Sequence, residues 1–194
     1  MTSLNYVVVS TLLLTMNNET FELFFSMLSV ALLAGTLVVL VARMSYSRSS
    51  SARAIVSAFS PWALPLAAAV TTTCTLGSLY FSEIVNYKPC IMCWYQRTMM
   101  YPLAVILIIA AISKDKRVWR YATPLAAIGI VFSTYHWFLE RFPNLDAGVC
   151  DAEVPCEFVW FENFGFVTLP FMALTGFLAV LVFTTLPNTQ TEQS

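Results

Sequence analysis

Four of the five cysteines lie in two closely spaced pairs, a spacing that suits thiol–disulfide exchange. Cys90 and Cys93 form a C-x-x-C motif, and five residues separate Cys150 from Cys156. Redox-active pairs commonly use C-x-x-C at the start of a helix. The pattern therefore predicts two redox pairs, while two structural disulfides that hold loops together remain the alternative. Cys74 stands alone in an apolar stretch and is expected to be a small buried residue.

The C-x-x-C pair is expected at the first turn of a helix, because an apolar stretch begins directly after Pro89. Free backbone N–H groups and the positive end of the helix dipole favour a thiolate there. The thiolate is the nucleophile in disulfide exchange. Arg97 follows Cys93 by four residues and Cys90 by seven, so a helix would place all three on one face. Its charge would lower the cysteine pKa values; the alternative is an anchor that reaches the lipid headgroups.

His136 is the only histidine and lies near the end of another apolar stretch. It could hydrogen-bond or protonate a reduced electron carrier. The alternative is a histidine within the aromatic belt at the membrane surface. We expect six aromatic residues near that surface, one or two of them lining a pocket for a quinone ring: Trp94, Tyr95, Tyr101, Trp137, Trp160 and Phe161.

The elements that position these residues are predicted to be membrane-spanning helices. The 194-residue chain is 58% hydrophobic and 11% charged, whereas soluble domains carry about 25% charged residues. A helix needs about 20 apolar residues to cross a bilayer, and five stretches qualify: 21–42, 61–81, 91–112, 121–139 and 164–186. The apolar stretch 4–16 is shorter and follows no basic residue, so we expect an extracytoplasmic or interfacial segment rather than a signal peptide.

Lysine and arginine placement predicts the orientation, because cytoplasmic loops are enriched in both. Basic residues cluster after the first and third stretches, at Arg43, Arg48, Arg53, Lys114, Lys116, Arg117 and Arg120. These two loops are therefore expected in the cytoplasm, with the N-terminus and both cysteine pairs on the extracytoplasmic side. The net charge of −1 gives no reason to expect a nucleic-acid partner.

The segment Lys88-Pro89-Cys90-Ile91-Met92-Cys93-Trp94-Tyr95-Gln96-Arg97 resembles the DsbB family of disulfide bond formation proteins. The segments from Cys150 to Cys156 and from Glu162 to Pro170 are similar to the short-loop, BdbC-like branch of that family. The resemblance covers roughly residues 60–186. The first predicted span and the basic loop after it lie outside the familiar four-span pattern.

The resemblance implies an all-α membrane protein: a four-helix transmembrane bundle, here with one extra N-terminal transmembrane helix. It divides the chain into an N-terminal extension with the extra helix and a basic cytoplasmic loop (1–58), a DsbB-like four-helix oxidoreductase domain (59–187) and a polar cytoplasmic tail (188–194). It implies a multi-pass protein of the inner or plasma membrane. The partner would be a DsbA-like thioredoxin-fold thiol oxidase, and the cofactor a membrane quinone, either ubiquinone or menaquinone.

The resemblance also implies a role for each site residue. Cys150 would form the mixed disulfide with the partner, and Cys156 would be its pair mate. Cys90 would receive the exchange from the loop, with Cys90–Cys150 as the expected interloop disulfide, and Cys93 would lie against the quinone. Arg97 matches the quinone-side arginine of the family. His136 falls near a histidine that lies close to the quinone in some members.

Three alternatives remain open at this level. A vitamin-K-epoxide-reductase-like quinone reductase also combines C-x-x-C with loop cysteines, but there the loop pair usually comes first in the chain. A membrane scaffold with structural disulfides would have no redox activity. A four-cysteine zinc site is disfavoured by the oxidising compartment and the wide separation of the pairs, so no metal is expected.

Overall fold

The computed structural model describes residues 2–146, 148–150 and 153–186, with side chains from Asn18 onward. The α-helices are α1 (Thr2–Met44), α2 (Ser50–Phe59), α3 (Ala63–Leu79), α4 (Ile91–Ser113), α5 (Trp119–Leu139) and α6 (Leu169–Thr184). Within these described residues the only strand-like pairing is an isolated bridge between Asn163 and Val167. The predicted all-α fold is therefore confirmed.

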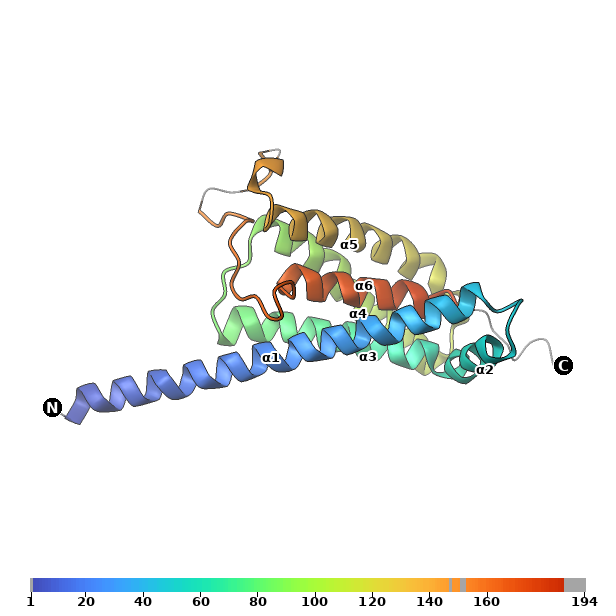
Figure 1. The fold of residues 1–194 in the computed structure, drawn as a ribbon, viewed down its shortest axis with the longest axis horizontal. Coiled ribbons are helices and arrows are strands. Elements are labelled where there is room, and N and C mark those ends of the chain that lie inside the picture. The colour runs from blue at the N-terminus through green and yellow to red at the C-terminus, as the bar shows by residue number, and fades with distance from the viewer. Residues whose placement is uncertain (1, 147, 151–152, 187–194) are drawn as a thin grey trace.

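Helices α3, α4, α5 and α6 form a four-helix bundle in which α3 packs on α4, α4 on α5, α5 on α6 and α6 on α3. Helix α1 packs along α6 from outside this bundle, and its N-terminal part projects beyond the other helices (Figure 1). The stretch 4–16, expected as an interfacial segment, forms this first part of α1. The predicted four-helix bundle with one extra N-terminal helix is confirmed.

Among the residues that the structure describes, four helical segments are long and apolar enough to cross a membrane: Asn18–Met44, Ser50–Ile84, Ile91–Ser113 and Lys116–Leu139. The second is longer than the predicted stretch 61–81, because α2, a 3₁₀ turn (Ser60–Trp62), α3 and a π-helical turn (Tyr80–Ile84) follow one another directly. The side chain of Ser49 accepts a hydrogen bond from the amide of Ala52 and so caps α2. Part of the predicted basic loop is therefore helical.

Helix α6 begins at Leu169, five residues after the predicted start of the fifth span at residue 164. Phe164 and Gly165 have φ angles of 56° and 74°, and consecutive left-handed residues cannot belong to a right-handed helix. Pro170 then lies in the first turn of α6, where its missing N–H costs no hydrogen bond. The resulting helix has 16 residues, or about 24 Å at ~1.5 Å per residue.

Close helix contacts in the bundle depend on small residues. A Cβ atom on Gly129 of α5 would lie 2.4 Å from the ring of Phe177 in α6, and Phe177 is fully buried. A Cβ atom on Gly176 of α6 would lie 2.8 Å from the Cys74 sulfur in α3. These two glycines let α6 approach α5 and α3 closely, as small residues do in membrane helix packing.

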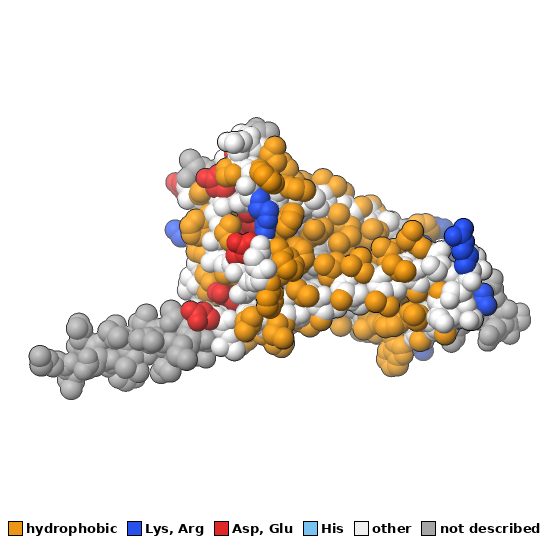
Figure 2. Space-filling model, viewed as in Figure 1, with side chains coloured by type: hydrophobic (Ala, Val, Ile, Leu, Met, Phe, Trp, Pro, Cys, Tyr) orange, Lys and Arg blue, Asp and Glu red, His pale blue; other side chains and the backbone are white. Residues whose placement is uncertain are grey.

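Charged side chains gather at the two ends of the molecule and leave a broad apolar surface between them. Figure 2 shows acidic side chains at the end that carries the connection between α5 and α6, and basic side chains at the opposite end. Such a belt suits lipid, because hydrocarbon cannot solvate exposed charges. The protein is a multi-pass membrane protein.

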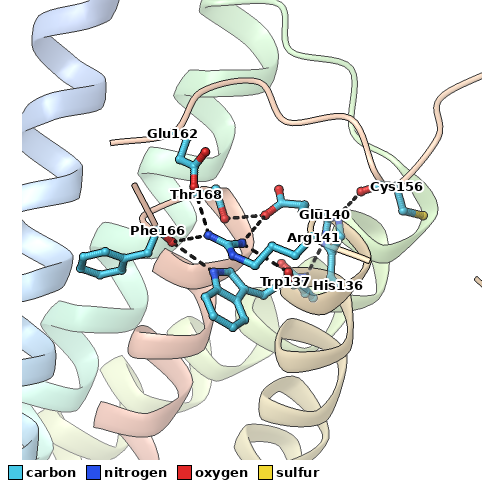
Figure 3. A network of polar contacts seen from close by, with 9 residues as sticks. His136, Trp137, Glu140, Arg141, Cys156, Glu162, Phe166 and Thr168 are labelled. Atoms are coloured by element: carbon cyan, nitrogen blue, oxygen red, sulfur yellow. Dashed lines mark hydrogen bonds and ion pairs between the residues drawn. The ribbon is translucent and has the colours of Figure 1, made fainter. Parts of the chain in front are cut away.

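The connection from α5 to α6 is held against the end of the bundle by Arg141. Its Nη2 lies 3.1 Å from Glu162 Oε1 and donates to the carbonyl oxygen of Phe166 at 3.3 Å. Its guanidinium also lies over the Trp137 ring, 4.0 Å from the ring centroid. Trp137 donates from Nε1 to the same Phe166 carbonyl at 3.1 Å (Figure 3). These contacts hold the part of the connection just before α6 against the end of α5.

Candidate functional site

The C-x-x-C pair lies at the start of α4, as the sequence predicts. Cys90 is the N-cap residue, with an extended backbone, and its sulfur accepts a hydrogen bond from the amide of Cys93. The two sulfurs lie 3.1 Å apart as free thiols. A small movement would therefore be enough to join them in a disulfide.

The two cysteines of this motif differ in their surroundings. Cys90 is buried in a cluster that includes Cys156 and Leu139 and does not line the neighbouring cavity, whereas Cys93 packs against that cluster and also lines the cavity. The predicted shared face for Cys90, Cys93 and Arg97 therefore holds only for Cys93 and Arg97. An N-cap residue has non-helical dihedral angles, so helical periodicity does not give the direction of the Cys90 side chain.

Cys150 and Cys156 form a disulfide with their Cα atoms 5.8 Å apart. Cys156 is only 2% exposed and packs in the same cluster as Cys90, while Cys150 at its edge is partly exposed. The fold thus already places the loop pair over the start of α4. Cys150 is therefore more accessible from outside the protein than Cys156.

His136 connects the two cysteine pairs. Its Nε2 lies 3.6 Å from the Cys90 sulfur and 3.2 Å from the carbonyl oxygen of Cys156 (Figure 3). Its Nδ1 lies 2.9 Å from Gln96 Nε2. In the tautomer that satisfies all three contacts, Gln96 donates to Nδ1, and the Nε2–H group faces the carbonyl oxygen and the sulfur. The structure thus places His136 beside Cys90. His136 does not itself line the cavity that Cys93 lines, but its partner Gln96 does.

The pKa of the Cys90 thiol is lowered from its usual value. The hydrogen bond from Cys93 is the main cause, and the nearby His136 adds to it against the opposing effect of burial. Cys90 is therefore the thiolate of the pair, the form that attacks and leaves in exchange. One turn after His136, burial raises the pKa of Glu140 to about 7, and Thr168 donates a hydrogen bond of 2.6 Å to that carboxyl group.

The cavity beside Cys93 has a volume of about 340 Å³ and is lined mainly by apolar side chains from α1, α3, α4 and α6. We call it the Cys93 cavity; its lining includes Cys74, Arg97, Tyr101 and Trp160. Two of the six predicted surface aromatic residues, Tyr101 and Trp160, thus line it. Small-molecule sites typically have this size and this apolar character with a few polar groups.

Arg97 lies in the wall of the Cys93 cavity. Its Nε donates to Ser78 Oγ at 3.0 Å, and its Nη2 donates to the Ser78 carbonyl oxygen at 3.2 Å. The guanidinium also lies 5.3 Å from the ring centroid of Trp94. These contacts hold a positive charge in the same cavity wall as Cys93. The same wall includes Lys88, so the mainly apolar cavity carries cationic hydrogen-bond donors.

Gln96, Ser78 and Glu140 were not singled out from the sequence. A glutamine next to Arg97 and a serine in an apolar stretch have no distinctive spacing, and their roles depend on contacts between helices. For Glu140 the spacing alone indicates proximity to His136, because it lies four residues later and so shares the same helix face.

In this helical membrane bundle a buried histidine contacts both cysteine pairs, and an apolar cavity lies beside them. This arrangement is that of a membrane thiol–disulfide oxidoreductase. The chain belongs to the DsbB family: the family model described as disulfide bond formation protein DsbB matches residues 60–186. Helix α1 lies outside the matched residues.

The chain is similar to curated disulfide formation proteins of Bacillus species. The chain is 47% identical over 109 residues to the "Probable disulfide formation protein C 1" of Bacillus cereus, covering 56% of this chain and 78% of that protein. It is 42% identical over 131 residues to the "Disulfide bond formation protein C" of Bacillus subtilis, covering 66% of this chain and 90% of that protein. No solved structure matches the chain.

Proposed function

We propose that this protein is a protein-disulfide:quinone oxidoreductase that reoxidises a DsbA-like thioredoxin-fold partner on the extracytoplasmic side of the membrane. One observation carries the proposal: Cys90 faces the loop disulfide while Cys93, three residues later, faces the Cys93 cavity. A single pair can therefore exchange with the loop on one side and deliver electrons on the other. The acidic end with the cysteines faces outward, since basic side chains mark the cytoplasmic end.

The exchange begins with both pairs oxidised. A partner thiolate attacks Cys150, forms a mixed disulfide and releases the Cys156 thiolate. Cys156 attacks Cys90, which breaks the Cys90–Cys93 bond and leaves a Cys93 thiolate at the cavity. The burial of Cys156 in the Cys90 cluster favours Cys156, rather than the expected Cys150, as the interloop partner of Cys90.

The second partner thiol then attacks the mixed disulfide and leaves as the oxidised partner, releasing Cys150. Cys150 attacks Cys156, restores the loop disulfide and frees Cys90. The sulfurs in the structure, bonded in the loop and free at α4, have the arrangement reached at this point. His136 Nε2–H hydrogen-bonds the released Cys90 thiolate, and Arg97 holds positive charge in the wall beside Cys93.

A quinone, when bound, would supply the acceptor for the two electrons and two protons that Cys90 and Cys93 give up as their disulfide re-forms. Cys93 and Arg97, with the aromatic residues Tyr101 and Trp160, would hold it in the Cys93 cavity. Reduction of a quinone is energetically reasonable, because a partner as oxidising as DsbA needs an acceptor of still higher potential; ~30 mV corresponds to ~1.4 kcal/mol for two electrons.

Replacement of Cys93 by serine tests the proposal. Purified Cys93→Ser protein should lose quinone reduction with a reduced DsbA-like substrate, measured by quinone absorbance, while the loop pair still forms a mixed disulfide with that substrate. Cys74→Ser is the matched control, since Cys74 is a free cysteine that lines the same cavity; it should turn over normally. Wild-type turnover in Cys93→Ser would refute the proposed route.

The reduced site also has the ligand set of a metal centre. One ligand atom each from Cys90, Cys93 and His136 lies within 4.8 Å of the others, and thiolate with imidazole suits zinc. The prediction that no metal belongs here is checked by elemental analysis of the protein purified in its reduced form.

A further inference from the structure

Helix α1 supplies one wall of the Cys93 cavity, although it lies outside the matched family region. Its contribution consists of Phe25, Leu28, Ser29 and Leu32. The same lining includes Cys74 and Gly77 of α3 and Cys93 and Arg97 of α4. Residues of the N-terminal helix and of the redox pair therefore line one continuous space.

Polar contacts hold α1 in this position at both ends of the membrane-spanning part. Near the cysteine end, the Tyr87 hydroxyl donates to the Glu22 carboxylate, and Asn163 Nδ2 donates to Ser26 Oγ at 2.9 Å. Near the basic end, Arg43 Nη1 donates to Thr185 Oγ1 at 2.6 Å. Burial and the hydrogen bond to Glu22 together raise the pKa of the Tyr87 hydroxyl, which is a donor in this contact. Helix α1 is thus fastened to the bundle.

The two faces of α1 differ in the way expected of a helix that covers a site. The buried face carries small hydroxyl side chains, with Ser26 fully buried and Ser29 only 6% exposed. The lipid face carries large apolar side chains such as Phe24 and Met27, each 58% exposed. Small residues allow a close approach to α6, and Ser29 leaves room in the cavity because its hydroxyl donates back to the Ser26 carbonyl oxygen at 2.9 Å.

Phe25 sets the spacing between α1 and α3. A Cβ atom on Gly77 would lie 3.1 Å from the Phe25 ring, and the centroids of the Phe25 and Phe81 rings are 5.7 Å apart. This aromatic contact lies at the edge of the cavity and limits its width.

From this arrangement we infer that α1 is part of the quinone site, closing the Cys93 cavity toward the lipid and determining which quinones fit beside Cys93. The inference rests on the proposed function and extends it. With α1, four helices line the acceptor site (α1, α3, α4 and α6), whereas the matched region alone would leave this side of the cavity open to lipid.

Photolabelling of the wild-type protein gives a direct test that needs no variant. A ubiquinone analogue with an azide on its ring should label the peptide that contains Phe25 and Ser29, together with the α4 peptide that contains Cys93. Excess short-tailed ubiquinone should suppress both labels. Labelling of the α4 peptide without the α1 peptide would overturn the inference and leave the proposed function standing.

A cavity-filling variant gives the second test. Ser29→Phe should weaken binding of a short-tailed ubiquinone about tenfold, measured by quenching of tryptophan fluorescence, since Trp160 lines the cavity. Met27→Phe on the lipid face is the matched control and should bind like wild type. Mixed-disulfide formation with the reduced partner, measured without quinone, should be unchanged in both variants and shows that they are folded.

The outcomes separate the two claims. Wild-type affinity in a folded Ser29→Phe protein would overturn the role of α1 alone. A wild-type protein that neither binds nor reduces quinones would overturn the proposed function itself.

Discussion

At the scale of single residues, the direction in which each side chain points decides what it can do. The residue types and their spacing were enough to predict the two cysteine pairs and the position of Cys90 at a helix start. They could not predict that only Cys93 of this pair lines the cavity with Arg97, because the N-cap geometry of Cys90 departs from helical periodicity. Nor could they predict that His136 lies beside Cys90, since this depends on how α5 is rotated against α4.

His136 gives a prediction about the acidity of Cys90. A hydrogen bond to a charged group contributes about 1.5–3 kcal/mol, and ~1.4 kcal/mol corresponds to one pKa unit. Because the Nε2–H group stabilises the thiolate, His136→Leu should raise the Cys90 pKa by about one unit. Alkylation of Cys90 in the reduced protein, followed by mass spectrometry across pH, should therefore shift to higher pH.

Gln96→Leu should cause a smaller shift in the same direction, because Gln96 acts on Cys90 indirectly, by holding the His136 ring. Tyr135→Phe is the control, since the Tyr135 hydroxyl donates to the carbonyl oxygen of Leu145 instead. An unchanged alkylation profile in His136→Leu would show that the histidine does not tune Cys90.

At the scale of helices, apolar length predicted the elements well and their ends less well. The spans 91–112 and 121–139 agree closely with α4 and α5. The start of α6 was predicted too early, because Phe164 and Gly165 are apolar or small but adopt a left-handed turn. Hydropathy does not report backbone dihedral angles, so it extends a span into any apolar turn beside it.

The contact between α5 and α6 gives a prediction about stability. Gly129→Ala places a methyl group against the buried Phe177 ring, and overpacking typically costs about 1–3 kcal/mol. We expect a lower melting temperature in detergent, measured by near-ultraviolet circular dichroism. Gly35→Ala is the matched control, because a Cβ atom on Gly35 of α1 would meet no atom within 4 Å.

Replacing the ring should relieve the overpacking. The double variant Gly129→Ala with Phe177→Leu should lose less stability than the sum of the two single variants. Strictly additive losses would show that the two residues do not limit the approach of α6 to α5.

At the scale of the whole molecule, charge separation along the bundle predicts its orientation. In a variant with the five native cysteines replaced by serine, a cysteine at exposed Glu157 should react with a membrane-impermeant maleimide in intact cells. A cysteine at exposed Lys116, at the basic end, should react only after permeabilisation. The reverse pattern would place both cysteine pairs in the cytoplasm and contradict the proposed partner.

The different surroundings of Cys90 and Cys93 also limit how fast small thiols can consume the membrane oxidant. Under the proposed route, water-soluble thiols meet only the loop disulfide, and the lipid-borne oxidant meets only the sulfur inside the bundle. Electrons and protons pass from the loop disulfide to the cavity only through the Cys90–Cys93 pair. Small thiols such as glutathione would then consume membrane oxidant no faster than they can reduce Cys150–Cys156, so the cell keeps its oxidising power for the partner that this loop admits.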